Sequence, residues 1–237
     1  MNLSPKSRRS GVERNQWTDT SFLNDQQEHI PMKLVRWLEM AGIFLGVPLL
    51  LFGDLVPRPK IIALLAVCIV CLVMLLRDKT FDRSRFGLND FHNWRRLFVR
   101  FVIIASCIAL YVIFVEPGNV LTIVRHNPSL WALIMIVYPF LSVVPQEIIY
   151  RTFFFHRYSS LFSQKRVSIV INAALFAFAH ILFKNWVAVI GSFVAGLIWA
   201  TTYLETKSLL AVSIEHALYG NFVFTLGVGY YFYAPDF

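Results

Sequence analysis

Residues 130–157 read LWALIMIVYPFLSVVPQEIIYRTFFFHR, a run in which apolar side chains far outnumber polar ones. As an α-helix these 28 residues would rise about 42 Å, more than the roughly 30 Å hydrocarbon core of a bilayer. The run therefore predicts a membrane-spanning helix. It also contains charged side chains, which are costly in lipid and usually face the interior of a helix bundle.

Six more apolar runs precede or follow this stretch in the sequence, near 34–55, 61–76, 97–115, 167–183, 186–204 and 208–233. The whole chain is 57% hydrophobic and 15% charged, whereas soluble domains are about 25% charged. We predict an all-α fold, a polytopic transmembrane helix bundle of about seven spans over residues 34–237. Residues 1–33 are polar, and we expect them to form a disordered cytoplasmic tail.

Basic residues indicate the orientation of the bundle. If the N-terminus lies inside, 18 of the 22 Lys and Arg residues fall on the inner side. The positive-inside rule then predicts a cytoplasmic N-terminus and an outer C-terminus in the cell (inner) membrane. The net charge of +8 sits between apolar runs, where anionic lipid is the partner. We therefore expect a lipid bilayer as partner and no nucleic acid.

The link at 80–98 combines apolar and basic residues. Phe91, Trp94 and Phe98 recur at helical spacing, with arginines between them (Arg83, Arg85, Arg95 and Arg96). This pattern predicts an amphipathic helix lying on the inner leaflet.

Apart from Glu39, which stands alone in the first run, the polar residues inside the runs collect in three of the seven spans. They are Gln146, Glu147 and Arg151 in the fourth, Asn172 and His180 in the fifth, and Glu215, His216 and Asn221 in the seventh. From the inner ends of their helices, Glu147, His180 and His216 lie about 16, 21 and 12 Å deep. We expect this acid and these two imidazoles to meet in one layer.

Helical spacing also predicts which side chains share a face. Glu147 and Arg151 are four residues apart and can form an ion pair. Asn172, Phe176 and His180 follow at intervals of four along one stripe of the fifth span. We expect this stripe to face the same interior.

Such a set could perform several kinds of chemistry. A carboxylate near imidazoles can activate water, and no Ser or Cys nucleophile lies in an obvious site turn. His180, His216 and Glu147 could instead bind a divalent metal such as zinc. A proton relay in a small transporter would use similar residues, although the chain has no internal repeat. Each residue alone could also simply pack or hydrogen-bond within the bundle.

Three motifs resemble those of the CPBP family of intramembrane proteases, which includes CAAX proteases and bacteriocin-processing (Abi) proteins. Residues 145–153, PQEIIYRTF, resemble its Glu-Glu-x-x-x-Arg motif. Phe176 to His180 resembles Phe-x-x-x-His, and residues 213–221, SIEHALYGN, resemble the last motif of His followed by Asn or Asp. The motifs stand in family order, and the resemblance covers roughly residues 130–225.

The resemblance implies a membrane-embedded endopeptidase that cleaves a membrane-associated peptide or protein, prenylated in eukaryotes. It implies that Glu147 and His180 activate water, that His216 and Asn221 bind the oxyanion, and that Arg151 supports Glu147. A catalytically silent family member, acting as a membrane scaffold or immunity factor, is the alternative. Substrate identity and oligomeric state are not specified by these motifs.

Two positions depart from the family pattern. The first motif glutamate, which the family generally uses to activate water, is replaced by Gln146, so Glu147 would have to take its role. The family usually spaces its last His and Asn by four residues, but Gly220 occupies that position and Asn221 follows it. Either a π-bulge at Gly220 returns Asn221 to the face of His216, or Asn221 lies outside the site.

Overall fold

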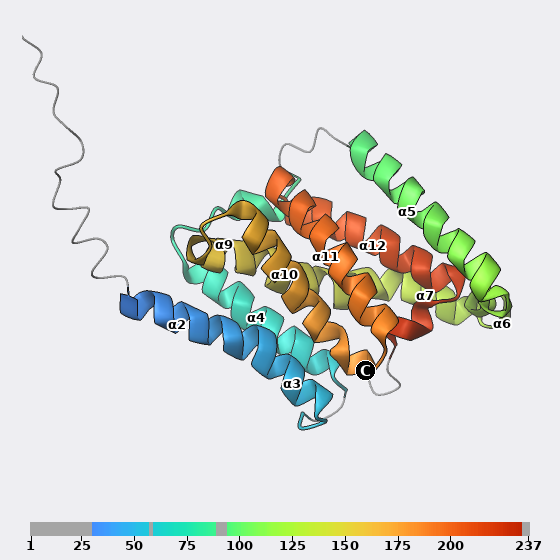
Figure 1. The fold of residues 1–237 in the computed structure, drawn as a ribbon, viewed down its shortest axis with the longest axis horizontal. Coiled ribbons are helices and arrows are strands. Elements are labelled where there is room, and N and C mark those ends of the chain that lie inside the picture. The colour runs from blue at the N-terminus through green and yellow to red at the C-terminus, as the bar shows by residue number, and fades with distance from the viewer. Residues whose placement is uncertain (1–29, 57–58, 89–93, 234–237) are drawn as a thin grey trace, which may run out of the picture.

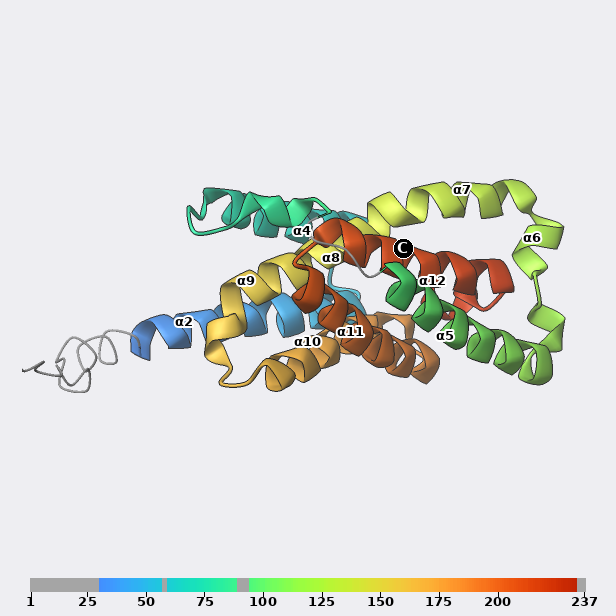
Figure 2. The same ribbon diagram turned by 90° about the horizontal axis from the view of Figure 1, so that it is seen from above.

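The computed structural model describes residues 30–56, 59–88 and 94–233. Over these ranges the regular secondary structure is entirely helical, without a strand. The helices run beside one another in a single elongated bundle (Figure 1, Figure 2). The predicted all-α class is confirmed.

Six helical segments of the described chain are long and apolar enough to cross a membrane: Met32–Phe52, Trp94–Val115, Pro128–Leu161, Lys165–Phe183, Trp186–Thr206 and Leu209–Leu226. A seventh apolar helix, α4 (Ile61–Arg77), is shorter. Its 17 residues rise about 26 Å, close to the thickness of a hydrocarbon core. The expectation of about seven spans is therefore confirmed, and each span overlaps the apolar run that predicted it.

Several spans are composite. The first joins α2 (Ile30–Ala41), the π-helical η1 (Gly42–Gly46) and α3 (Val47–Phe52). The longest joins α7 (Pro128–Tyr138), η4 (Pro139–Val143), α8 (Val144–Glu147), η5 (Ile148–Phe153), α9 (Phe154–Tyr158) and η6 (Ser159–Leu161). The next joins α10 (Lys165–Ala179) and η7 (His180–Phe183). The remaining elements are η2 (Arg83–Phe86), α5 (Trp94–Val115), η3 (Pro117–Asn119), α6 (Thr122–His126), α11 (Trp186–Thr206), α12 (Leu209–Leu226) and η8 (Gly229–Phe232).

A layer of aromatic side chains forms the centre of the core. Phe44 is fully buried, and its ring centroid lies 5.1 Å from that of Tyr150, 5.6 Å from Phe154 and 6.0 Å from Tyr158. Tyr150 in turn packs edge-on against Phe176 of α10 at 5.1 Å. We call these five residues the aromatic layer. Large apolar side chains on the outside of the bundle, such as Phe114 and Trp186, are 78% exposed, as lipid-facing residues should be.

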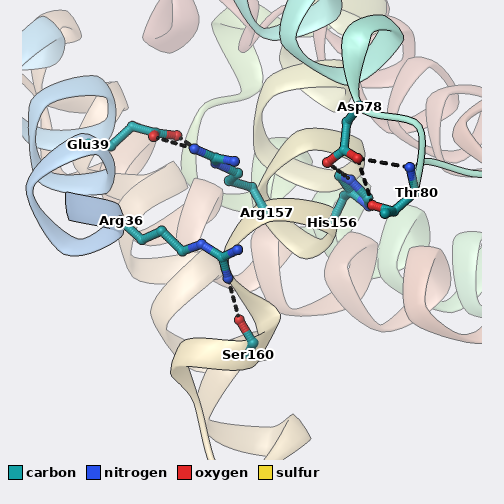
Figure 3. Close-up of polar contacts among 7 residues, drawn as sticks. All are labelled: Arg36, Glu39, Asp78, Thr80, His156, Arg157 and Ser160. Atoms are coloured by element: carbon teal, nitrogen blue, oxygen red, sulfur yellow. Dashed lines mark hydrogen bonds and ion pairs between the residues drawn. The ribbon is translucent and has the colours of Figure 1, made fainter. Parts of the chain in front are cut away.

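One end of the bundle, here called the basic end, gathers the start of α2, residues 78–88, residues 159–164 and residues 207–208. Figure 3 shows three contacts that tie it together: Arg157 to Glu39, His156 to Asp78, and Arg36 to Ser160. The Ser208 hydroxyl also donates to the backbone oxygen of Gly87 at 2.5 Å. Most of the basic segments predicted to lie on one side of the membrane therefore meet at one end.

The opposite end, here called the distal end, has its own polar contacts. Lys60 Nζ lies 2.8 Å from Asp54 Oδ1. The hydroxyls of Tyr230 and Tyr231 donate to the Glu116 carboxylate at 2.7 and 2.8 Å. These contacts join the loops at α4, α5 and η8, so the bundle has one polar layer at each end.

Two local predictions differ from the structure. Helix α2 begins at Ile30, inside the stretch expected to be a disordered tail, and residues 1–29 lie outside the described part. The predicted inner-leaflet helix at 80–98 is wrong where it is described. Residues 83–86 form one short turn, and Trp94 and Phe98 belong to the spanning helix α5. Phe91 lies outside the described residues.

Candidate active site

Glu147 is the last residue of α8, and its side chain is fully buried. Its Oε2 lies 3.4 Å from Nε of Arg151, which is equally buried. The expected ion pair is therefore present. The guanidinium also lies over the Phe176 ring, 4.7 Å from its centroid, so the buried charge faces a carboxylate and an aromatic ring, while its nitrogens make no hydrogen bond among the described residues.

His216 of α12 meets this carboxylate directly. Its Nδ1 lies 2.8 Å from Glu147 Oε1, and the carboxylate accepts the hydrogen bond. The imidazole stacks on Trp199 of α11 with ring centroids 3.6 Å apart. The bond and the stack together fix both the position and the plane of the His216 ring.

Tyr138, at the end of α7, completes this row although no motif pointed to it. Its hydroxyl lies 3.2 Å from Nε2 of His216. The ring fits there because α12 has a glycine opposite: a Cβ on Gly220 would lie 2.6 Å from Cζ of Tyr138. Gly220 is the signal in the sequence that could have indicated this close approach.

His180 also packs against Phe176. Its Nδ1 is 2.7 Å from the backbone oxygen of Phe176, and the two rings are 4.6 Å apart. The Phe176 ring is also 6.0 Å from His216. His180 and His216 thus both contact one aromatic ring, but no hydrogen bond among the described residues joins His180 to Glu147 or His216.

Asn172 and Phe176 lie on the predicted stripe of α10. Both are buried, and the Asn172 amide donates to the backbone oxygen of Tyr150 at 2.5 Å. The stripe therefore faces the motif helix, as its spacing predicted. The contact couples α10 to η5 directly after the Glu147 turn.

A cavity of about 730 Å³ lies beside this row of residues. Its polar lining includes Gln146, His180 and Tyr138. Glu147 is not part of the lining, because successive helical residues point about 100° apart and Glu147 faces the core. Gln146 is held by a hydrogen bond from its Nε2 to Ser142 Oγ at 2.7 Å.

Asn221 lies apart from the site. Helix α12 continues as a regular α-helix through Gly220, so of the two alternatives the π-bulge does not form. The Asn221 amide instead donates to the backbone oxygen of Met135 at 3.3 Å. π-Helical turns do occur at η4 and η5, which precede and follow Glu147 in the motif helix.

Two other acids within the spans, the buried Glu215 and the partly buried Glu39, have partners away from the cavity. Glu215 points away from His216 and forms an ion pair with Arg100 of α5. Arg100 also donates to Thr202 of α11 at 2.6 Å. Glu39 binds Arg157 at the basic end. Both acids therefore connect helices.

The residues proposed as zinc ligands do not fit a metal site as they lie. Both nitrogens of His216 already have protein partners, Glu147 and Tyr138. His180 Nδ1 is likewise engaged by the backbone oxygen of Phe176. Within the described residues no group of three His, Cys, Asp or Glu side chains is arranged to hold a metal ion.

Comparison with known proteins finds one family that this part of the chain resembles. Residues 128–223 match the family model described as type II CAAX prenyl endopeptidase Rce1-like. The matched segment contains Glu147, His180 and His216 and the helices that carry them. The resemblance to the CAAX-protease family is thereby confirmed. No curated protein and no solved structure matches the chain.

Proposed function

We propose that this chain, whose residues 128–223 match the CAAX-protease family model, is an intramembrane endopeptidase that hydrolyses a peptide bond of a membrane-associated protein. The observation that carries the proposal is the cavity on which His180, Gln146 and Tyr138 converge. A substrate carbonyl held there would have an imidazole, an amide and a phenol within reach.

His180 is the group best placed to activate water. Because its Nδ1–H donates to the Phe176 carbonyl, the lone pair of Nε2 is left for the cavity. As general base it would take a proton from water while the hydroxide adds to the carbonyl carbon. The imidazolium would then return that proton to the leaving amine.

Tyr138 and Gln146 are the proposed donors to the oxyanion. For Tyr138 this role requires His216 to be an imidazolium, with Nδ1–H donating to the Glu147 carboxylate and Nε2–H donating to the Tyr138 oxygen, because only then is the phenol hydrogen free to point into the cavity. The amide of Gln146 supplies further N–H groups at the same wall. Preorganised donors of this kind stabilise a tetrahedral intermediate.

Glu147 would then be a positioning residue that acts through His216. Its burial, its ion pair with Arg151 and the hydrogen bond that it accepts from His216 favour this role over direct contact with water. Likewise His216 would hold Tyr138, and Asn221 would have no part in the reaction. This assignment differs from the roles that the family resemblance implied.

The orientation is part of the proposal. We place the basic end in the cytoplasm and the chain in the cell (inner) membrane. The start of α2 and the basic segments at 77–100, 151–166 and 207 support this, because positively charged loops stay on the cytoplasmic side.

Cleavage assays with purified protein test the function. Membrane-anchored peptides carrying a fluorophore and a quencher would be supplied in lipid nanodiscs. His180→Ala should lower cleavage by about a hundredfold or more, since it removes the general base. Glu205→Gln, an exposed residue near the basic end, is the matched control and should cleave like wild type. Equal cleavage by wild type and His180→Ala would refute the proposal.

Gln146 supports one rival, the catalytically silent family member. It puts an amide at the cavity wall where the family usually has a carboxylate. A silent member would bind membrane peptides, detectable by photo-cross-linking into the cavity, and wild type would cleave none of them. Metal content of the purified protein, and cleavage with and without a chelator, would test the zinc hypothesis in the same samples.

A further inference from the structure

We infer that the cavity is entered from the distal end, on the non-cytoplasmic side of the membrane. Its partner would be a membrane-associated protein whose scissile segment lies in the outer leaflet or just outside it. The inference rests on the proposed function for the nature of the partner. The side of entry depends only on the cavity and the orientation.

The cavity walls come from the distal halves of the helices. They include Leu51 at the end of α3, Lys60 and Ile61 at the start of α4, Thr122 in α6 and Leu130 in α7. Gly227 and most of η8 close the remaining side. No residue of α5, α9, α11 or the connections at the basic end contributes to the lining.

The aromatic layer closes the cavity toward the basic end. Tyr150 is part of the cavity floor, and Phe44 and Phe176 pack edge-on against its ring. Phe154 and Tyr158, both fully buried, follow toward the basic end. Interiors packed in this way leave few voids for water, so the layer separates His180 from the cytoplasmic side.

Polar groups mark the distal mouth. Lys60 lines the cavity while pairing with Asp54, and Tyr230 lines it while donating to Glu116. Asn119 and His126, from the same end of the bundle, also line the cavity. Between this rim and Gln146 the walls are mainly aliphatic, including Leu133, Val137 and Leu141. An apolar segment entering from the rim would therefore meet the polar groups only at its two ends.

The positive-inside pattern assigns this mouth to the outside. The basic end carries the segments richest in Lys and Arg, and the distal end carries few of them. The cavity and the basic end lie on opposite sides of the aromatic layer. Because the basic end faces the cytoplasm and the cavity lies beyond the aromatic layer, the cavity is reached from the non-cytoplasmic side.

Cysteine accessibility tests the inference without any measurement of activity. The parent is Cys107→Ser, because Cys107 is exposed while Cys68 and Cys71 are buried. Single cysteines are then placed in the cavity, Thr122→Cys at the mouth and Ser142→Cys beside Gln146. Phe140→Cys, 70% exposed on the outside of the same helical segment, is the lipid-facing control, and Ser163→Cys reports the basic end.

Sealed right-side-out and inside-out vesicles are treated with a charged, membrane-impermeant thiol reagent. Thr122→Cys and Ser142→Cys should react faster in right-side-out vesicles, by on the order of tenfold or more, because the charged reagent crosses lipid poorly. Ser163→Cys should show the opposite preference, and Phe140→Cys should react in neither. Labelling of every variant after denaturation in detergent verifies that its thiol is present.

Three results would overturn the inference. Faster reaction of Ser142→Cys in inside-out vesicles would place the entrance on the cytoplasmic side. Failure of Ser142→Cys to react from either side would show that no aqueous path reaches the site. Reaction of Ser163→Cys from outside would invert the orientation. None of these depends on peptide cleavage, so the proposed function could fail while the access side stands.

Discussion

The hydroxyl of Tyr138 lies 3.2 Å from Nε2 of His216, and the ring that carries it passes over Gly220 of the neighbouring helix. The contact joins α7 to α12 at the level of the cavity. It connects the buried Glu147 carboxylate, through His216, to a group that the cavity exposes. The proposed oxyanion donor therefore depends on a glycine four residues after the histidine.

Gly220→Ala should separate Tyr138 from His216. The added methyl group would overlap the Tyr138 ring, which has to move away for α12 to keep its place. We expect cleavage to fall about tenfold to a hundredfold, as when an oxyanion donor is misplaced. The measurement is kcat and KM for the quenched peptide, with the loss mainly in kcat.

Gly42→Ala is the matched control for that substitution. Gly42 also lies within a helix, but a Cβ there meets no atom within 4 Å. It should leave cleavage unchanged and raise stability by up to about 1 kcal/mol, because alanine favours helix more than glycine does. Equal activity in the two alanine variants would refute a role for the Tyr138 contact.

Glu147→Ala should destabilise the bundle strongly. It leaves the side chain of Arg151, which is fully buried in the core, without its partner carboxylate. Breaking a buried pair by removing one partner typically costs about 3–5 kcal/mol. Glu147→Gln keeps an oxygen that can accept from His216, and we expect a smaller loss. Thermal unfolding in detergent measures both.

The pair Arg96–Glu205 offers a surface comparison. Its side chains are 63% and 46% exposed, and the two charged atoms lie 3.5 Å apart. Glu205→Ala should cost only about 0–1 kcal/mol, because solvent screens such pairs. If Glu147→Ala and Glu205→Ala lower the melting temperature equally, the buried pair does not have the structural role assigned to it.

Gln146→Glu should alter the chemistry of the cavity. The substitution places a carboxylate at the cavity wall, where it can accept a proton from water. We expect cleavage to increase in a slow wild-type enzyme, and to appear in a silent one. The assay is the quenched-peptide reaction, with Gln146→Met as a control that fills the same space without an acid. No difference between the two variants would mean that position 146 does not face the reacting bond.

The spans and the meeting of Glu147 with His216 could be predicted from the sequence, because long apolar runs and ionisable groups in lipid carry strong physical signals. The choice between Gln146 and Glu147 could not. Adjacent helical residues differ by about 100°, and only the packing of α12 and α10 decides which of them faces the core. Sequence reasoning therefore selected the acid by its chemistry and missed its burial.

Tyr138 was missed for a different reason. It precedes Glu147 by nine residues, and two side chains that far apart in one helix do not touch. A tyrosine in an apolar run is also common and attracts no notice. Its role comes from α12, which is distant in sequence. Gly220 was interpreted as easing a bulge for Asn221, whereas in the structure it leaves space for a ring from another helix.

The rim of the cavity should respond to acid. Hydrogen bonds from Tyr230, Tyr231 and Asn119 to the Glu116 carboxylate outweigh its partial desolvation and lower its pKa below the usual 4.5. A lowered pKa in the folded state means that Glu116 stabilises the fold fully above about pH 4.5, the unfolded value, and progressively less as the pH falls through the folded value. Glu116→Gln should therefore lower the melting temperature at pH 7, and the difference from wild type should shrink steadily in buffers below pH 4.5. Tyr230→Phe, which removes one donor to the same carboxylate, should show a weaker form of the same pH dependence. A difference between wild type and Glu116→Gln that stays constant from neutral to acidic pH would mean that the rim is not held by an ionised carboxylate.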